Sequence, residues 1–126
     1  MKARIDLTRI PPQAIRPLIT LGAQAEASGL GPALLELVKM RASQINGCAY
    51  CLDMHSKDAR AAGETEQRLY LLPAWRETAL YTERERAALA WTEAVTLVAD
   101  SHVPDDTYAE VSKHFSEPEL VALTLP

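Results

Sequence analysis

The sequence predicts an all-α protein, and three observations support that prediction. Apolar residues recur with helical spacing along nearly the whole chain. No alternating run of Val, Ile and Thr is bounded by hairpin turns, and the chain has one asparagine and five glycines. With 126 residues, of which 48% are hydrophobic and 24% are charged, the composition is that of one globular domain with one core. We therefore expect residues 1–126 to form a single helical domain.

Three helices are expected in the first half of the chain, after a short extended segment at residues 5–7. The first helix covers residues 17–28, because a proline is favourable in the first turn and glycines follow the last. The second helix covers residues 32–45 and also opens on a proline. The Asn-Gly pair at 46–47 tolerates positive φ and predicts a tight corner. A third helix then begins at or near residue 48 and ends at the glycine at 63.

The second half of the chain shows four further helical segments. The proline at 73 is expected to stop a short helix over residues 66–72. Thr82 and Glu85 have the spacing of a capping box, in which both side chains bind free backbone N–H groups, and a long helix is expected from there to about residue 99. A helix after the proline at 104 would carry apolar side chains at 108, 111 and 115 on one side. A second capping box at 116–119 begins a final helix, which we expect to be cut short at residue 126.

The charge pattern argues against two classes of partner. The net charge is −4 and no basic cluster exceeds two residues, so neither nucleic acid nor an anionic membrane is expected to bind. Charged residues stand near the N-terminus where a signal peptide would be apolar, and no run is long enough to span a membrane. The expected location is the cytoplasm, where thiols are kept reduced, so a close cysteine pair there is more often catalytic, redox-active or metal-binding than structural.

Two cysteines, Cys48 and Cys51, are followed by a histidine, His55. On a helix, Cys51 neighbours both of the others, whereas Cys48 and His55 are about 10 Å apart. The imidazole can therefore serve Cys51, so we assign Cys51 as the reacting thiolate and Cys48 as the thiol that resolves it. A helix N-terminus and an adjacent imidazole both favour a thiolate. Such a pair can reduce a hydroperoxide through a sulfenic acid and a disulfide, which an external dithiol then reduces, with no metal, flavin or haem.

An acidic partner for His55 can be sought on the preceding helix, because the corner at 46–47 folds that helix back alongside. Counting from the corner along each helix, His55 lies at about 13 Å and Glu36 at about 16 Å. We therefore expect Glu36 to reach His55 directly or through a water, and to orient the base that moves protons for Cys51. The alternative for Glu36 is an ordinary solvated ion pair with Lys39, three residues later.

Together, Glu36, Cys48, Cys51 and His55 resemble the active-site pattern of the AhpD-like alkylhydroperoxidases, within the carboxymuconolactone decarboxylase superfamily. The flanking segments 40–51 and 57–60 are also similar to that family, and the similarity spans roughly residues 30 to 100. It implies an AhpD-like helical domain that assembles into trimers or hexamers and reduces peroxides with its cysteine pair. The cysteine pair would stand at the N-terminal end of a central helix, packed antiparallel to the helix before it.

Two differences from that family carry their own implications. A histidine occupies the position of Tyr50 in the founding peroxidase branch, which implies a simpler proton relay here. Relatives continue through a further apolar helix after the position of Leu125, which implies a shortened final helix.

The decarboxylase branch lacks the cysteine pair, so decarboxylation is disfavoured. The expected partners are a hydroperoxide substrate, an external dithiol of lipoyl or thioredoxin-like type, and further copies of the chain.

Several alternatives remain open for the same residues. The pair could act as a redox sensor or in disulfide exchange without sustained turnover. Cys-x-x-Cys plus His55 supplies three zinc ligands, and His102, His114 or a carboxylate could be the fourth in a zinc-stabilised interaction module. Two buried cysteines could also be core residues only. Arg41, near the corner, could favour a thiolate or could simply be exposed.

Overall fold

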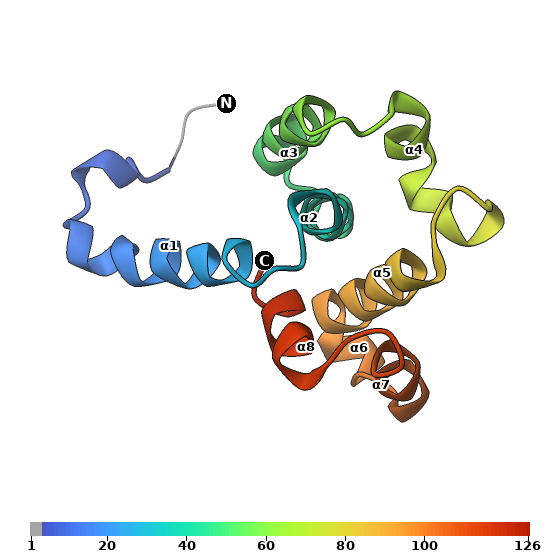
Figure 1. Ribbon diagram of the computed structural model, residues 1–126. Coiled ribbons are helices and arrows are strands. Elements are labelled where there is room, and N and C mark those ends of the chain that lie inside the picture. Colours follow the sequence, from blue (N-terminus) through green and yellow to red (C-terminus); the bar gives the residue numbers. More distant parts are fainter. Residues whose placement is uncertain (1–3) are drawn as a thin grey trace.

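The computed structural model describes residues 4–126, and every regular element in that range is a helix (Figure 1). The all-α prediction is therefore confirmed. None of the helices in this range has the length and apolar character needed to cross a membrane. The α-helices are α1 (Pro12–Glu26), α2 (Pro32–Asn46), α3 (Ala49–Ala61), α4 (Glu66–Leu71), α5 (Glu83–Thr96), α6 (Val98–Ser101), α7 (Asp105–Val111) and α8 (Glu117–Leu123), and the 3-10 turns are η1 (Leu7–Arg9) and η2 (Leu72–Glu77).

Helix α2 is the most enclosed element, because five consecutive residues, 34–38, are buried. A helix that is buried on all sides needs packing partners on all sides. Two apolar clusters supply them, and both contain residues of α2 and α5. The first cluster adds residues of α7 and α8, and the second adds residues of α3, α4 and η2. In Figure 1, α3 and α4 accordingly lie on one side of α2 and α5, and α7 and α8 on the other.

The N-terminal part of the chain differs from the sequence prediction. Helix α1 begins at Pro12 rather than Pro17, so that Pro12 takes the favourable first position and Pro17 lies inside the helix. Residues 5–7 are not an extended segment, because the Asp6 carboxylate accepts the backbone N–H of Thr8 at 3.0 Å and caps the turn η1. Only Ala25 of α1 is buried, and Figure 1 shows the helix extending away from the others.

Helix ends also differ in the second half. The α-helix before the proline at 73 ends as predicted, but the chain continues directly as the 3-10 helix η2. The long helix α5 stops at Thr96, because Leu97 leaves helical geometry, and α6 follows as a separate turn. Both predicted capping boxes are present, at Thr82 with Glu85 and at Ser116 with Glu119. Phe115 lies beyond the end of α7, yet it is 4% exposed and packs in the first cluster.

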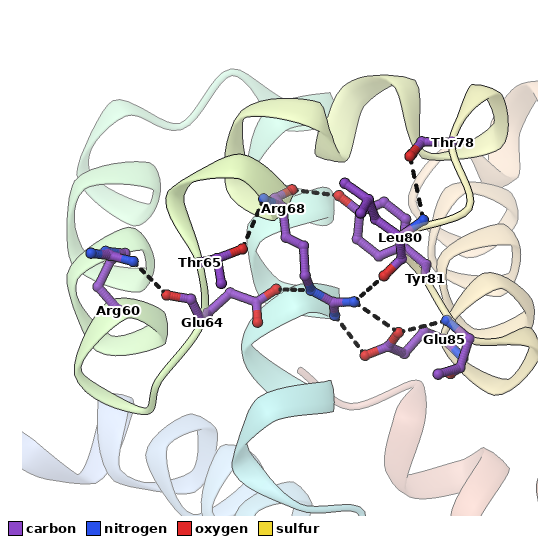
Figure 2. A network of polar contacts seen from close by, with 9 residues as sticks. Arg60, Glu64, Thr65, Arg68, Thr78, Leu80, Tyr81 and Glu85 are labelled. Carbon is purple, nitrogen blue, oxygen red and sulfur yellow. Dashed lines mark hydrogen bonds and ion pairs between the residues drawn. The ribbon is translucent and has the colours of Figure 1, made fainter.

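Arg68 on α4 connects the layer that holds α3 and α4 to α5 (Figure 2). Its guanidinium donates to Glu64 at 2.5 Å, to Glu85 at 2.7 Å and to the carbonyl of Leu80. The Tyr81 hydroxyl donates in turn to the carbonyl of Arg68. Arg68 and Glu85 side chains are each 19% exposed, so the ion pair is largely shielded from water. This network borders the second cluster through Tyr81, and α3 packs against the same cluster through Ala59.

Candidate functional site

A tight corner between α2 and α3 sets the start of the site. Gly47 has a φ of 62°, in the left-handed region that costs other residues energy. Its N–H donates to the carbonyl of Gln44 at 3.3 Å, and the N–H of Cys48 donates to the carbonyl of Ser43 at 3.1 Å. This pair of bonds is the Schellman arrangement that ends many helices. The corner predicted from the Asn-Gly pair is present, with the positive φ on Gly47, and it places Cys48 as the N-cap of α3.

The two cysteines are joined in a disulfide at the N-terminal end of α3. Their Cα atoms are 5.3 Å apart, within the usual range for such a bond. Both residues are half-buried, so a small molecule or a partner thiol can approach the pair. The backbone N–H of Cys51 donates to the sulfur of Cys48 at 3.3 Å. The direct bond from the helix N-terminus therefore goes to Cys48, while Cys51 lies in the first turn of the helix.

Glu36 and His55 meet across the interface of α2 and α3. Oxygen Oε2 of Glu36 is 3.0 Å from Nδ1 of His55, so the direct contact expected from the helix count is present. The side chains are 12% and 16% exposed. A carboxylate can only accept, so Nδ1 carries the proton of this bond and Nε2 is the nitrogen left for another partner. His55 follows Cys51 by four residues on α3, which places both on one face of the helix.

Lys39 belongs to the same group of side chains. It donates to Oε1 of Glu36 at 3.1 Å and also to Glu26, at the end of α1. Burial alone lowers the pKa of Lys39, but its bonds to Glu26 and Glu36 outweigh that effect and raise the pKa above its ordinary value. The sequence suggested either a Lys39 pair or a His55 contact for Glu36, and the structure has both. Glu26 was not found from the sequence, since no spacing rule indicates where the end of α1 packs.

Arg41 and Tyr50 flank the corner. Arg41 is not exposed, because it donates to Glu93 at 2.9 Å and to Gln44 at 3.0 Å, and its side chain is 16% exposed. Burial by itself raises the pKa of Glu93, but the hydrogen bonds from Trp75, Arg76 and Arg41 lower it overall. The charge of Arg41 is thus committed to Glu93. Tyr50, between the two cysteines, is 76% exposed and lies on the surface.

One group of side chains in the described range is close enough together to bind a metal ion. Ligand atoms of Glu36, His55 and Asp58 all lie within 4.8 Å of one another. Glu36 is already held by Lys39 and His55, and the sulfurs of the proposed zinc set are bonded to each other. His114 pairs with Glu110 at 3.4 Å, and His102 ends α6. The geometry therefore favours thiol chemistry over a zinc site.

Comparison with known proteins assigns the chain to a family. The model of the carboxymuconolactone decarboxylase family matches residues 12–94, and the chain belongs to that family. Within the family it is AhpD-like, since a solved structure with a TM-score of 0.92 and 43% identity covers 98% of this chain and 85% of its own. That structure is ATU0492 from Agrobacterium tumefaciens, a protein of unknown function provisionally described as the antioxidant defence protein AhpD.

Sequence relatives are known from several bacteria. YdfG of Bacillus subtilis is 41% identical over 125 residues, which cover 99% of this chain and 85% of YdfG. YnjA of Escherichia coli is 28% identical over 80% of this chain and 55% of its own length. Rv2313c of Mycobacterium tuberculosis is 30% identical over 82% of this chain and 36% of its own. All three are uncharacterised. The family and the AhpD neighbour favour a role in antioxidant defence.

Proposed function

We propose that this protein is a thiol-dependent peroxidase of the alkylhydroperoxidase type. One observation carries the proposal: an accessible Cys48–Cys51 pair begins the helix whose His55, one turn later, is bonded to Glu36. A thiol, a base and an orienting acid are the parts that nucleophilic catalysis requires. Peroxide reduction uses each of them, and no metal or organic cofactor has a role in the cycle.

The reaction has three steps that balance. The Cys51 thiolate attacks the outer oxygen of a hydroperoxide, so that the O–O bond breaks, an S–O bond forms and the alcohol leaves after taking up a proton. The Cys48 thiol then attacks the sulfenic acid sulfur, which gives the disulfide and water. An external dithiol, of lipoyl or thioredoxin-like type, reduces the disulfide and is itself oxidised. Two electrons pass from the dithiol to the peroxide in each cycle.

Protons for these steps are carried by His55. Its free nitrogen, Nε2, takes the proton of the Cys51 thiol and returns it to the departing alkoxide. Glu36 fixes the ring through Nδ1 and stabilises the imidazolium that forms. A small pocket of about 110 Å³ borders Glu36, which is large enough to hold water beside the carboxylate.

Steady-state peroxide consumption with an organic hydroperoxide and dithiothreitol or dihydrolipoamide tests the proposal. The wild-type protein is expected to turn over many equivalents of peroxide. Cys51→Ser should abolish consumption, and Cys48→Ser should slow turnover, because the Cys51 sulfenic acid must then be reduced by the external dithiol instead of by Cys48. Full activity in Cys51→Ser would refute the assignment of the reacting thiol.

A second candidate function is thiol–disulfide exchange or redox sensing without turnover. The bond from the Cys51 N–H to the Cys48 sulfur favours it, because a sulfur held by a helix N-terminus is a good thiolate in exchange reactions. This function predicts one fast oxidation by peroxide and no sustained consumption with any dithiol. The turnover measurement therefore separates the two candidates.

We also propose that the protein works as a homo-oligomer, a trimer or hexamer, in the cytoplasm. Helix α1 supports this, since several of its apolar side chains are exposed and a second copy would cover them. A groove of about 640 Å³ runs along the same helix. The exposed apolar residues on and before α1 are Ile5 (64%), Leu7 (61%), Leu18 (67%), Ile19 (67%) and Leu21 (47%).

A further inference from the structure

Lys39 is a half-buried cation next to the proposed proton relay. It lies on α2, one turn after Glu36, and its side chain is 16% exposed. A lysine in such a position is shielded from water, so it needs acceptors within the protein. It has two, from different helices: Oε1 of Glu36 at 3.1 Å and the carboxylate of Glu26 from α1. The ammonium group thus joins the end of α1 to the relay.

Both oxygens of the Glu36 carboxylate are in use. Oε1 accepts from Lys39 at 3.1 Å, and Oε2 lies 3.0 Å from Nδ1 of His55. A carboxylate held at one oxygen can rotate about its last bond, whereas one held at both has a fixed plane. The orientation in which Oε2 faces the imidazole therefore depends on the contact that Lys39 makes at the other oxygen.

The local charges give Lys39 a second effect. Three carboxylates lie in this group: Glu36 contacts both Lys39 and His55, Glu26 of α1 contacts Lys39, and Asp58 of α3 lies within 4.8 Å of Glu36 and His55. Like charges at this spacing repel one another and would turn the Glu36 side chain toward solvent. A positive charge between Glu26 and Glu36 removes that tendency. The raised pKa of Lys39 keeps this group protonated throughout the neutral range.

We infer that Lys39 is a positioning residue, which fixes the Glu36 carboxylate so that His55 keeps its proton on Nδ1 and presents Nε2 to Cys51. The inference rests on the proposed function of this site and adds a residue that acts through Glu36 and His55 without touching the thiol. In its absence, the imidazole is free to carry its neutral-state proton on either nitrogen. The tautomer with the proton on Nε2 cannot accept the proton of a thiol at that nitrogen.

Nitrogen-15 NMR of labelled histidine reads the tautomer directly. The signal of His55 is assigned with a His55→Gln variant, and the wild-type protein is expected to show the Nδ1–H form. Lys39→Met should populate the Nε2–H form and slow the oxidation of Cys51 by an organic hydroperoxide about tenfold. Lys39→Arg, which keeps the charge and the donors, should restore both the tautomer and most of the rate.

Glu26→Gln is the matched control. It weakens the same contact between α1 and α2 but leaves the bond from Lys39 to Glu36, so the tautomer and the rate should match the wild type. If the circular dichroism of Lys39→Met shows that its helices are lost, the tautomer and the oxidation rate are measured in Lys39→Gln instead. An unchanged Nδ1–H signal in a folded, neutral Lys39 variant would overturn the inference. Failure of the proposed function is a distinct outcome. A wild-type protein that does not react with peroxide would still show the tautomer of His55 in its NMR spectrum.

Discussion

At the scale of single residues, the proposed mechanism depends on His55 more than on any neighbour except the cysteines. Its Nδ1 is held by Glu36 at 3.0 Å, and it follows Cys51 by one helical turn. Two further side chains, Lys39 and Asp58, approach this pair. In the proposed mechanism, Nδ1 therefore orients the ring and Nε2 transfers the proton.

Replacing the base tests this account of the relay. In His55→Gln the rate of Cys51 oxidation by an organic hydroperoxide should fall about hundredfold at neutral pH, because general acid–base catalysis contributes an effect of this size. Glu36→Gln should cause a smaller loss, since the imidazole remains. Stopped-flow measurement of thiol oxidation gives both rates. A His55→Gln protein that is as fast as the wild type would remove the histidine from the mechanism.

The core of the site was predictable from the sequence, but its surroundings were not. The Cys-x-x-Cys spacing, the Asn-Gly corner and the rise per residue were sufficient to place Glu36 beside His55, because local helix geometry determines those positions. The bond from Lys39 to Glu26 depends instead on where α1 packs. The pairing of Arg41 with Glu93, 52 residues away, is likewise a tertiary contact. Neither has a sequence signal of its own.

At the scale of helices, the corner at Gly47 determines how α2 and α3 meet. A Cβ atom added there would find no heavy atom within 4 Å, so the cost of a side chain comes from the backbone alone. Gly47→Ala should lower the free energy of unfolding by about 1 kcal/mol, the penalty for a left-handed residue. Gly22→Ala is the matched control, because Gly22 lies inside α1 with equal space and the substitution should stabilise the helix. Urea unfolding measures both, and a neutral Gly47→Ala would contradict this reading of the corner.

Arg68 connects α4 to α5 through its ion pair with Glu85. Arg68→Met would leave Glu64 and Glu85 without their cation and should lower the free energy of unfolding by about 3 kcal/mol at neutral pH. Burial alone raises the pKa of Glu85, but the bonds from Arg68 and Thr82 reverse this and lower it. Because the pKa of Glu85 is lower in the folded state than the ordinary value of about 4.3 in the unfolded chain, its ionised form stabilises the fold above that pH. This stabilisation is lost as the pH falls through the pKa of the folded state.

The stability difference between wild type and Arg68→Met should therefore narrow in acid. Denaturant unfolding between neutral pH and pH of about 3 covers the relevant range. A difference that stays constant over this range would show that the ion pair with Glu85 contributes little. Lys57→Met is a suitable control, since Lys57 pairs with Asp53 at 2.7 Å but both side chains are about 70% exposed, at 72% and 69%.

Helix boundaries were less predictable than helix identity. Pro12 and Pro17 can each begin a helix, and the sequence does not say that Pro17 is tolerated inside one. The break at Leu97 has no proline or glycine to mark it. By contrast, the ends of α2 and α3 carry Gly47 and Gly63, both with positive φ, and these ends agreed within two residues with the prediction.

At the scale of the whole molecule, the proposed assembly depends on α1. Its outer residues Leu18 and Ile19 are each 67% exposed, and only Ala25 of this helix is buried. The chain has a mass of 13.9 kDa, and light scattering should give a multiple of it, threefold or sixfold. The double variant Leu18→Glu, Ile19→Glu should shift the protein to the monomer, because charges would be buried in the contact.

Tyr70→Glu serves as the control for that variant, since Tyr70 on α4 is 73% exposed. It should leave the mass unchanged. A wild-type protein with the mass of one chain at micromolar concentration would contradict the proposed assembly, and a multimer unaffected by the α1 substitutions would place the contact elsewhere.

Mass spectrometry of the thiols tests the central claim most directly. The reduced Cys48→Ser protein is treated with one equivalent of an organic hydroperoxide in the presence of dimedone, which traps sulfenic acid. The account predicts a single adduct on Cys51, and in the reduced wild type a disulfide between Cys48 and Cys51. A Cys51 thiol that survives the peroxide unmodified in both proteins would contradict it.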